Sequence, residues 1–406
     1  MKLLHLVSLR EVGGIQRDFA NFVSTRPAGR AVEHHLLLTR PGIAEAIAPQ
    51  VRSSVASIRA LRHWRALEIP AALPMVRQWW FERAVKRSQA DAIVLWSAPR
   101  ALQHIDVPPS TRLIYYEHGA AWFNRDTDEV ARQVKRADGI VCNSNASARM
   151  MRLRWGVGAA QPVVVCPNAV VMPTGASATG PRLLSPGARL TLGVAGRLEP
   201  LKGGVLAVHA LRALLDHGVD ARLLVAGTGP DRARLEQQAA TLEISERVEF
   251  LGFVDQMQSF YAQLDVFLCP SIREPFGLVC AEAMAHGLPV VCSAVDGLPE
   301  VVLDGVTGVC VPPSLSLTDY GAYGGVADGV PAHVYDPASD AIGPARLVDP
   351  AGLANAVLAV TADEAVYARF SGAALERAGV LADYAGHVGD VLDAIRSFIN
   401  VPGEAA

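Results

Sequence analysis

Short apolar runs alternate along the whole chain with longer amphipathic segments. This alternation is typical of parallel β-strands that are buried on both faces and connected by helices. In the first half the predicted strands are Leu3–Ser8, His35–Thr39, Ala92–Trp96, Leu113–Tyr116, Gly139–Cys142 and Val163–Cys166. In the second half they are Leu190–Ala195, Ala221–Ala226, Val248–Leu251, Val266–Cys269, Pro289–Ser293 and Gly308–Val311. Two such series predict two doubly wound α/β domains.

The length of 406 residues also fits two domains better than one core. We expect the first domain to span residues 1–172 and the second to span residues 189–380. The segment 173–188 is rich in Pro, Gly, Ser and Ala and is predicted to link them. Residues 312–349 interrupt a strand-to-helix connection, and an irregular stretch of this length is usually functional or disordered. Apolar residues at helical spacing predict a last helix over residues 381–399.

The composition indicates a globular protein, because half of the residues are apolar and about a fifth are charged. The six cysteines show no metal-binding or redox spacing, and several lie in apolar runs, so we expect buried, reduced thiols. The apolar run at the N-terminus is too short for a signal peptide, and no run approaches the roughly 20 residues of a membrane span. We therefore expect a cytoplasmic protein.

The net charge of −3 conceals two oppositely charged halves. Residues 1–180 contain 23 Lys and Arg against 13 Asp and Glu, whereas the remainder contains 14 against 27. A basic half favours an anionic partner, either a membrane surface or a phosphate-bearing acceptor. The sequence shows no recognition helix, zinc finger or basic strand interleaved with aromatics, so we do not expect nucleic acid to be the partner.

The segment 59–87 concentrates this positive charge together with aromatic residues. Its cations outnumber its two acidic residues, and its aromatics are Trp64, Trp79, Trp80 and Phe81. Such a composition is typical of a peripheral membrane surface and predicts an anionic lipid contact. The alternative is an amphipathic pair of helices, broken near Pro70 and Pro74, whose aromatics lie in the core.

Two glycine-containing turns are candidate phosphate sites. Gly13 and Gly14 follow the first strand and open a helix, where free amides and the helix dipole suit a phosphate. They lack the G-x-G-x-x-G spacing of a dinucleotide site, which argues against an NAD enzyme. Arg197 and Lys202 follow the strand Leu190–Ala195 and are expected at the carboxyl edge of the sheet, where two cations can hold a diphosphate.

Two carboxylates lie eight positions apart, at Glu274 and Glu282. If a helix begins near Gly277, Glu282 lies on its second turn and Glu274 on the preceding loop. The amides of Phe276, Gly277 and Leu278 are then unpaired at the helix N-terminus and can receive phosphate or sugar oxygens. A glycosidase needs two comparable carboxylates that face each other, and these unlike settings argue against one.

Several motifs occur in order along the chain. They are Gly196–Gly203, Ala226–Pro230, Leu251–Val254, Glu274–Glu282, Gly297–Glu300 and the pair Gly305 and Gly308. Together they resemble the retaining GT-B glycosyltransferases of group 1, also called family 4. In the first half the resemblance extends to Gly13-Gly14 and to Glu117-His118-Gly119. It implies the GT-B fold, with two Rossmann-like domains that face a cleft and a last helix that packs back on the first domain.

The resemblance also implies an activity: retaining, metal-independent transfer of a sugar from a nucleoside-diphosphate donor, most often UDP- or GDP-linked, to a hydroxyl acceptor. A donor phosphate oxygen would take the acceptor proton while Arg197 and Lys202 stabilise the leaving charge, in place of a metal. No Asp-x-Asp metal motif appears where the donor would need one, and no further cofactor is expected. The basic first half favours a glycan or lipid-linked acceptor, in cell-envelope polysaccharide, lipopolysaccharide or glycolipid synthesis.

Roles for individual residues follow from the same resemblance. Arg197 and Lys202 would bind the diphosphate, and Glu282 would bind the ribose. Glu274, with the backbone of Phe276, Gly277 and Leu278, would hold the transferred sugar. The remaining predicted site residues are His118 against the donor sugar, Phe253 and Val254 at the base, and Gly13, Gly14 and Gly227 around the donor.

Three other functions share this architecture. A nucleotide-sugar epimerase needs a set of catalytic carboxylates that the chain lacks in the right context. A phosphorylase needs a lysine for pyridoxal phosphate and a much longer chain. A noncatalytic nucleotide-sugar-binding protein usually has lost one site residue, whereas His118, Arg197, Lys202, Glu274 and Glu282 are all present.

Overall fold

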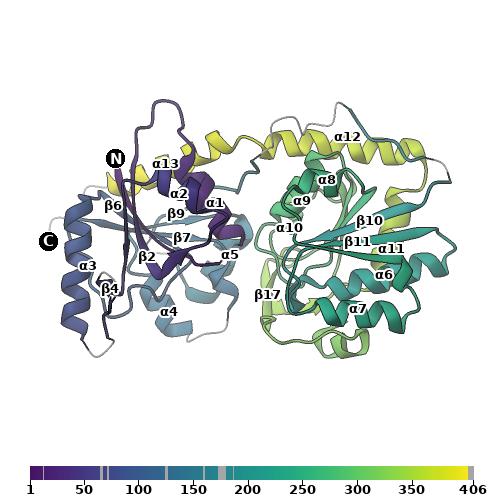
Figure 1. Ribbon diagram of the computed structural model, residues 1–406, viewed down its shortest axis with the longest axis horizontal. Coiled ribbons are helices and arrows are strands. Elements are labelled where there is room, and N and C mark those ends of the chain that lie inside the picture. Colours follow the sequence, from purple (N-terminus) through teal and green to yellow (C-terminus); the bar gives the residue numbers. More distant parts are fainter. Residues whose placement is uncertain are drawn as a thin grey trace. The chain divides into compact units, whose positions relative to one another are not determined.

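The computed structural model describes residues 1–11, 13–64, 67–70, 73–123, 127–158, 161–171, 180–185 and 187–400. The chain forms two compact units, shown in Figure 1. The first comprises Met1–Asn168 together with the residues from Tyr384 onward, and the second comprises Ala169–Asp383. The predicted linker at 173–188 falls largely outside the described residues, so it stays a prediction.

A mostly parallel sheet forms the centre of the first unit, in the order β5-β4-β3-β2-β1-β6-β7-β8-β9. These strands are β1 (Lys2–Leu9), β2 (Glu33–Ile43), β3 (Ser57–Ala60), β4 (His63–Trp64), β5 (Leu67–Glu68), β6 (Ala92–Trp96), β7 (Arg112–Glu117), β8 (Gly139–Cys142) and β9 (Val163–Val165). The six strands predicted in this half are confirmed. The prediction missed β3, because its four residues are only half-buried and include one large apolar side chain, Ile58.

Helices follow most strands of the first unit. They are α1 (Gly14–Ser24), α2 (Ala48–Ser54), α3 (Pro74–Ser88), α4 (Thr127–Val134), α5 (Asn145–Trp155) and α13 (Tyr384–Ile399), with a 3-10 turn at Ala120–Trp122. The last helix α13 belongs to this unit and lies against its sheet, because a Cβ on Gly139 of β8 would lie only 2.3 Å from the Phe398 ring. Residue 139 must therefore be glycine for α13 to pack there.

The predicted start of this last helix at residue 381 is wrong by three residues. Leu381 is the final residue of the preceding helix, α12 (Glu364–Leu381), and α13 begins at Tyr384. The backbone oxygen of Leu381 accepts a hydrogen bond of 2.8 Å from the Val170 amide, which fixes this position within the second unit. Leu381 is apolar because it ends a buried face of α12, so its periodicity alone could not separate the two helices.

The second unit contains a six-stranded parallel sheet in the order β12-β11-β10-β13-β14-β15. Its strands are β10 (Leu190–Ala195), β11 (Ala221–Ala226), β12 (Val248–Gly252), β13 (Val266–Cys269), β14 (Val290–Ser293) and β15 (Gly308–Val311). All six were predicted. The helices are α6 (Gly204–Asp216), α7 (Arg232–Thr241), α8 (Met257–Tyr261), α9 (Leu278–Ala285), α10 (Leu298–Val301), α11 (Pro350–Val360) and α12, with 3-10 turns at Pro200–Lys202 and Ser245–Arg247.

The insertion, residues 312–349, is ordered, so the disorder alternative is wrong. It contains the strand pair β16 (Leu315–Ser316) and β19 (Arg346–Leu347), and the hairpin β17 (His333–Asp336) and β18 (Ala341–Pro344). A 3-10 segment, Leu317–Tyr323, follows β16 in the sequence and precedes β17. The side chains of Ser316 and Asp319 cap it. Strands this short carry no readable periodicity, which is why the sequence showed only an irregular stretch.

The basic aromatic segment 59–87 is not a pair of helices. Its first part forms β3, β4 and β5, and α3 begins only at Pro74. Trp80 and Phe81 are buried, so the core alternative holds for these two, whereas Trp79 is exposed and the lipid contact of this segment stays a prediction. The side chain of Trp64 and the whole of Arg65 lie outside the described residues.

All six cysteines are buried, as predicted. Among the described helices, none combines the length and the hydrophobicity needed to cross a bilayer.

Candidate functional site

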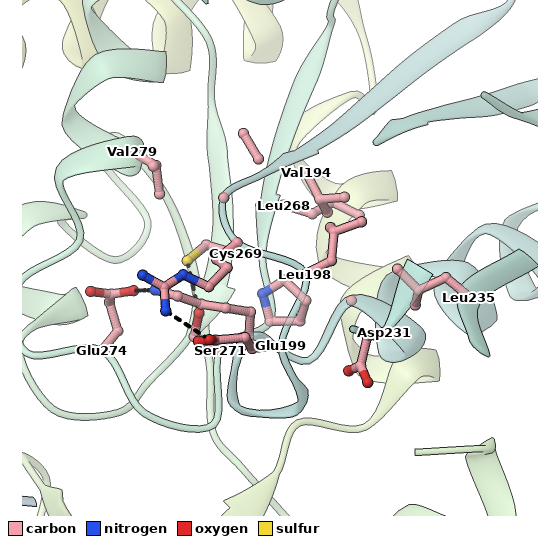
Figure 2. A pocket seen from close by; sticks show the side chains of 16 residues that line it. Val194, Leu198, Glu199, Asp231, Leu235, Leu268, Cys269, Ser271, Glu274 and Val279 are labelled. Atoms are coloured by element: carbon pink, nitrogen blue, oxygen red, sulfur yellow. Dashed lines mark hydrogen bonds and ion pairs between the residues drawn. The ribbon is translucent and has the colours of Figure 1, made fainter. Parts of the chain in front are cut away.

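A pocket opens at the carboxyl edge of the second sheet. It lies where the strand order reverses, between β10 and β13, which is the usual position of ligand sites in open α/β sheets. Arg197, Lys202 and Glu274 line it together with Cys269 and Val279, around a volume of about 30 Å³. Figure 2 shows Glu274, Ser271 and Cys269 gathered on one side of the pocket, and Asp231 with Leu235 on the other.

The loop that carries both cations is held by glycines. Gly203 ends the turn Pro200–Lys202 with a left-handed φ of 65°, and a Cβ there would lie 2.0 Å from the Pro270 oxygen. The amide of Ile272 donates a 2.9 Å hydrogen bond to the Leu201 oxygen, so the loop after β10 is fixed to the loop after β13. A residue with a side chain at position 203 would force these loops apart.

Gly227 lets the loop after β11 pack against the loop after β10. Its φ is 134°, and a Cβ there would lie 1.8 Å from the backbone oxygen of Gly196. The Leu198 amide donates to the Thr228 oxygen over 2.9 Å, next to this contact. The predicted role of Gly227 in donor binding is thus accompanied by a clear structural one, which is to let two turns touch.

Lys202 and Glu274 form the central ion pair of the pocket. The Lys202 Nζ and Glu274 Oε2 atoms are 2.5 Å apart, and Glu274 is the more buried partner. Burial opposes the charge on Lys202, but the adjacent Glu274 carboxylate outweighs it and raises the pKa of the lysine. Lys202 is therefore a fixed cation. Arg197 also lines the pocket, and its Nη1 lies 2.9 Å from the Glu199 carboxylate.

The loop before α9 presents the predicted backbone donors. Gly277 caps the helix with a φ of 102°, and Phe276 before it is buried. Within the described residues, the amides of Phe276, Gly277 and Leu278 donate no hydrogen bond. These three groups at a helix N-terminus can therefore receive ligand oxygens, as predicted from the sequence.

Glu282 lies on α9, as predicted, and its carboxylate accepts a 2.8 Å hydrogen bond from the Tyr261 hydroxyl. Tyr261 was not predicted as a site residue, because its sequence context is that of an ordinary core residue. After β12, the Phe253 side chain is 60% exposed and Val254 is half-buried. Glu282, Phe253 and Val254 do not line the small pocket, so their donor contacts stay predictions.

Gly13, Gly14 and His118 belong to the first unit. Gly13 is extended and caps α1, which begins at Gly14 directly after β1, as the strand-to-helix prediction requires. A Cβ on Gly14 would meet no atom within 4 Å, so space lies over this turn. The Gln16 side chain closes the turn with a 3.0 Å hydrogen bond to the Ser8 oxygen.

His118 follows β7 and is buried between aromatic rings. It stacks on Trp96 with ring centroids 5.2 Å apart, and it contacts Tyr116 at 4.1 Å. Burial, with a smaller contribution from His387, lowers the pKa of His118 to about 3, so the ring is neutral at physiological pH. Its Nε2 atom is buried without a hydrogen-bond partner in the described part of the chain.

Asp18 faces His118 and was not predicted as a site residue. Its Oδ2 atom lies 3.9 Å from the His118 Nδ1 atom, and its Oδ1 atom accepts a 2.7 Å hydrogen bond from the Tyr384 hydroxyl of α13. Burial raises the pKa of Asp18 to about 6, although the Tyr384 bond lowers it. One sequence feature points to Asp18: it lies four positions before Phe22, on the apolar face of α1.

Parts of the chain are similar in sequence to known glycosyltransferases. Residues 181–321 match the family model for glycosyl transferases group 1, which is less than half of the chain. A GDP-mannose-dependent α-(1-6)-phosphatidylinositol dimannoside mannosyltransferase of Mycobacterium tuberculosis is 43% identical over 110 residues, covering 26% of this chain and 28% of the relative. The chain thus matches less than a third of that relative's length.

Two longer matches extend beyond this segment. The 2-deoxystreptamine glucosyltransferase of Streptomyces kanamyceticus is 29% identical over 282 residues, covering 64% of this chain and 72% of the relative. Anabaena HepE, crystallised in complex with UDP, superposes with a TM-score of 0.73 at 19% identity, covering 98% of this chain and 100% of that one. The chain therefore has the GT-B fold with two Rossmann-like domains, as predicted.

Proposed function

We propose that this chain is a retaining glycosyltransferase that moves a sugar from a nucleoside-diphosphate donor to a hydroxyl acceptor without a metal ion. The observation that carries the proposal is the Lys202–Glu274 pair beside Arg197, at the carboxyl edge of the second sheet. The match of residues 181–321 to group 1 glycosyl transferases supports it. Fixed cations at such an edge suit a diphosphate leaving group.

The proposed reaction is the one that the resemblance to retaining GT-B glycosyltransferases implies, and the charges in this pocket suit it. The bond between the sugar's anomeric carbon and the diphosphate oxygen breaks, and the acceptor oxygen bonds to the same face of that carbon. The acceptor proton passes to a donor phosphate oxygen. Lys202 and Arg197 stabilise the negative charge that develops on the diphosphate, while the free amides of Phe276, Gly277 and Leu278 receive donor oxygens. Glu274 pairs with Lys202 and binds the transferred sugar.

UDP or GDP is the proposed nucleotide, because one relative is named as GDP-mannose-dependent and HepE was crystallised with UDP. We expect one of them to raise the melting temperature of the purified protein in EDTA. A ligand at a hundred times its Kd adds about 2.7 kcal/mol to the free energy of unfolding. UDP, GDP, ADP and CMP are compared by thermal shift, with uridine and guanosine as controls that lack the diphosphate. A shift that requires Mg²⁺, or none with any diphosphate, contradicts the proposed donor site.

The proposed acceptor is a lipid-linked or polyanionic envelope glycan, met at an anionic membrane. The supporting surface is the first half of α3, where Met75 is 85% exposed and Trp79 is 53% exposed. The Arg83 guanidinium lies 5.4 Å from the Trp79 ring. Burial, with Arg87 and Arg83 nearby, lowers the pKa of Arg59, so these three cations lie near one another, and Arg83 among them lies beside Trp79. Exposed apolar residues beside cations suit an anionic lipid surface.

The double variant Met75→Ser/Trp79→Ser is expected to bind phosphatidylglycerol vesicles about tenfold more weakly than wild type in a sedimentation assay, because two membrane-facing apolar groups are lost. The control is Val380→Ser on α12, which removes an exposed apolar side chain of the second unit and should bind as wild type does. Equal binding of wild type to neutral phosphatidylcholine vesicles, or equal binding by both variants, contradicts the lipid contact.

A further inference from the structure

The insertion, residues 312–349, contacts the loop that carries Lys202. Tyr320 of its 3-10 segment is buried, and its hydroxyl donates a 2.8 Å hydrogen bond to the backbone oxygen of Pro200. Pro200 begins the three-residue turn that ends at Lys202. The insertion also contacts α6, the helix after this turn, because the backbone oxygen of Tyr323 lies 3.1 Å from the His209 Nε2 atom. The insertion therefore restrains the backbone of the turn from which the Lys202 side chain extends.

The same insertion reaches Glu274 through Asp296. Asp296 is 1% exposed and has a left-handed φ of 49°, a conformation that favours glycine. Its Oδ1 atom accepts a 2.8 Å hydrogen bond from the Tyr335 amide of β17, and its Oδ2 atom accepts a 2.9 Å hydrogen bond from the Glu274 amide. The Asp296 amide in turn donates to the Tyr335 oxygen over 3.1 Å. One carboxylate thus joins the hairpin of the insertion to the backbone of Glu274.

We propose that the insertion is a positioning element of the donor pocket, which sets Lys202 through Tyr320 and Glu274 through Tyr335 and Asp296. This inference rests on the proposed function, since it assigns a task to both members of the ion pair. The two oxygens of the Asp296 side chain each accept one backbone hydrogen bond, so a single buried side chain holds both partners. A strained left-handed backbone conformation persists only where the surrounding contacts hold it in place. For Asp296 these contacts are the hydrogen bonds from Glu274 and Tyr335.

The two contacts act on different steps and can be separated. Tyr320→Phe removes only the hydroxyl that holds Pro200, so it is expected to weaken UDP or GDP binding about threefold to tenfold through Lys202. In Asp296→Asn the side-chain NH₂ group faces the backbone N–H of Glu274 or Tyr335, so one of the two hydrogen bonds is replaced by a contact between two donors. This variant is expected to lower kcat about tenfold while nucleotide affinity stays within threefold. Tyr323→Phe is the matched control, because its hydroxyl donates no hydrogen bond within the described residues.

Asp296→Gly distinguishes positioning from backbone strain. Glycine accepts the left-handed φ without strain but removes the carboxylate contacts to Glu274 and Tyr335, so kcat should fall as in Asp296→Asn, while the relief of strain offsets part of the stability lost with those contacts. Full turnover in Asp296→Gly, or equal effects of Tyr320→Phe and Tyr323→Phe on nucleotide affinity, overturns the proposal.

A second measurement needs neither donor nor acceptor. Hydrogen exchange of the free protein should speed up at the bonded amides of Lys202 and Gly203 in Tyr320→Phe, and at the Glu274 amide in Asp296→Asn, with no change in Tyr323→Phe. If wild type binds no nucleotide but exchange changes in this pattern, the proposed function fails while the positioning contacts stand. Unchanged exchange in all three variants overturns the positioning role whatever the enzyme binds.

Discussion

Lys202→Ala is expected to lower sugar transfer about a hundredfold to a thousandfold, because it removes a fixed positive charge from the leaving diphosphate. The Glu274 carboxylate, now without its partner at 2.5 Å, then lies in the pocket as an uncompensated negative charge beside the donor. Both effects act against a diphosphate, so the nucleotide Kd should rise together with the loss of kcat. Steady-state kinetics with the donor found by thermal shift, and calorimetric titration with its nucleoside diphosphate, measure the two quantities.

Arg189→Ala provides a control of matched charge. Arg189 is an exposed cation of the same unit, 3.1 Å from Asp220, and does not line the pocket. Its removal changes net charge equally but should leave turnover within threefold of wild type, because an exposed pair contributes little. If Lys202→Ala retains turnover and nucleotide affinity at the level of Arg189→Ala, Lys202 does not serve the diphosphate.

The second large effect concerns Asp18, whose substitution by asparagine is expected to stabilise the folded protein. An aspartate ionises near 3.8 when unfolded, whereas burial raises the pKa of Asp18 to about 6. The folded state therefore binds the proton more tightly between these pH values. The cost of the buried charge grows as the pH rises from about 4 to 6 and stays constant above. At pH 7.5 the variant should gain about 3 kcal/mol in free energy of unfolding.

The same variant should lose turnover, because the carboxylate that faces His118 at 3.9 Å is gone while Tyr384 keeps an oxygen to donate to. Urea unfolding at pH 3.5 and pH 7.5 measures the stability change, which should be small at the lower pH. The exposed Asp328→Asn serves as the control and should show no such pH-dependent gain. A loss of stability in Asp18→Asn at pH 7.5 would show that Asp18 is a structural residue with compensated charge.

The fold was predictable because its strands are buried on both faces. Each central strand is a short apolar run that differs in composition from the helices around it, and all twelve predicted strands are present. The strands that escaped prediction are β3, β4 and β5, at one end of the first sheet, and the strands of the insertion; β3 is only half-buried, and β17 begins and ends with polar residues. At such positions the alternation of apolar and polar residues is too short to read.

The candidate site divides in a similar way. Lys202, Glu274 and Gly277 belong to motifs that can be read along the chain, and the structure places all three on adjoining loops of the second unit. The place of Asp18 on the apolar face of α1 can be read from the sequence, but its partners at positions 118 and 384 are distant, so only the folded chain reveals which groups its carboxyl faces. Asp296 likewise appears as an ordinary turn residue until Tyr335, on a segment without periodicity, pairs with it.

The first unit is built from two separate parts of the chain, and this affects the order in which the two units fold during synthesis. The helix α13, which packs on β7 and β8 and carries Tyr384, follows all of residues 169–383 in the chain. At about 5 to 20 residues per second, a ribosome needs roughly ten seconds or more to reach it. Until then the nascent first unit exposes the apolar surface around Gly139 that Phe398 later covers. The second unit can therefore mature on the ribosome before the first, although it is translated later.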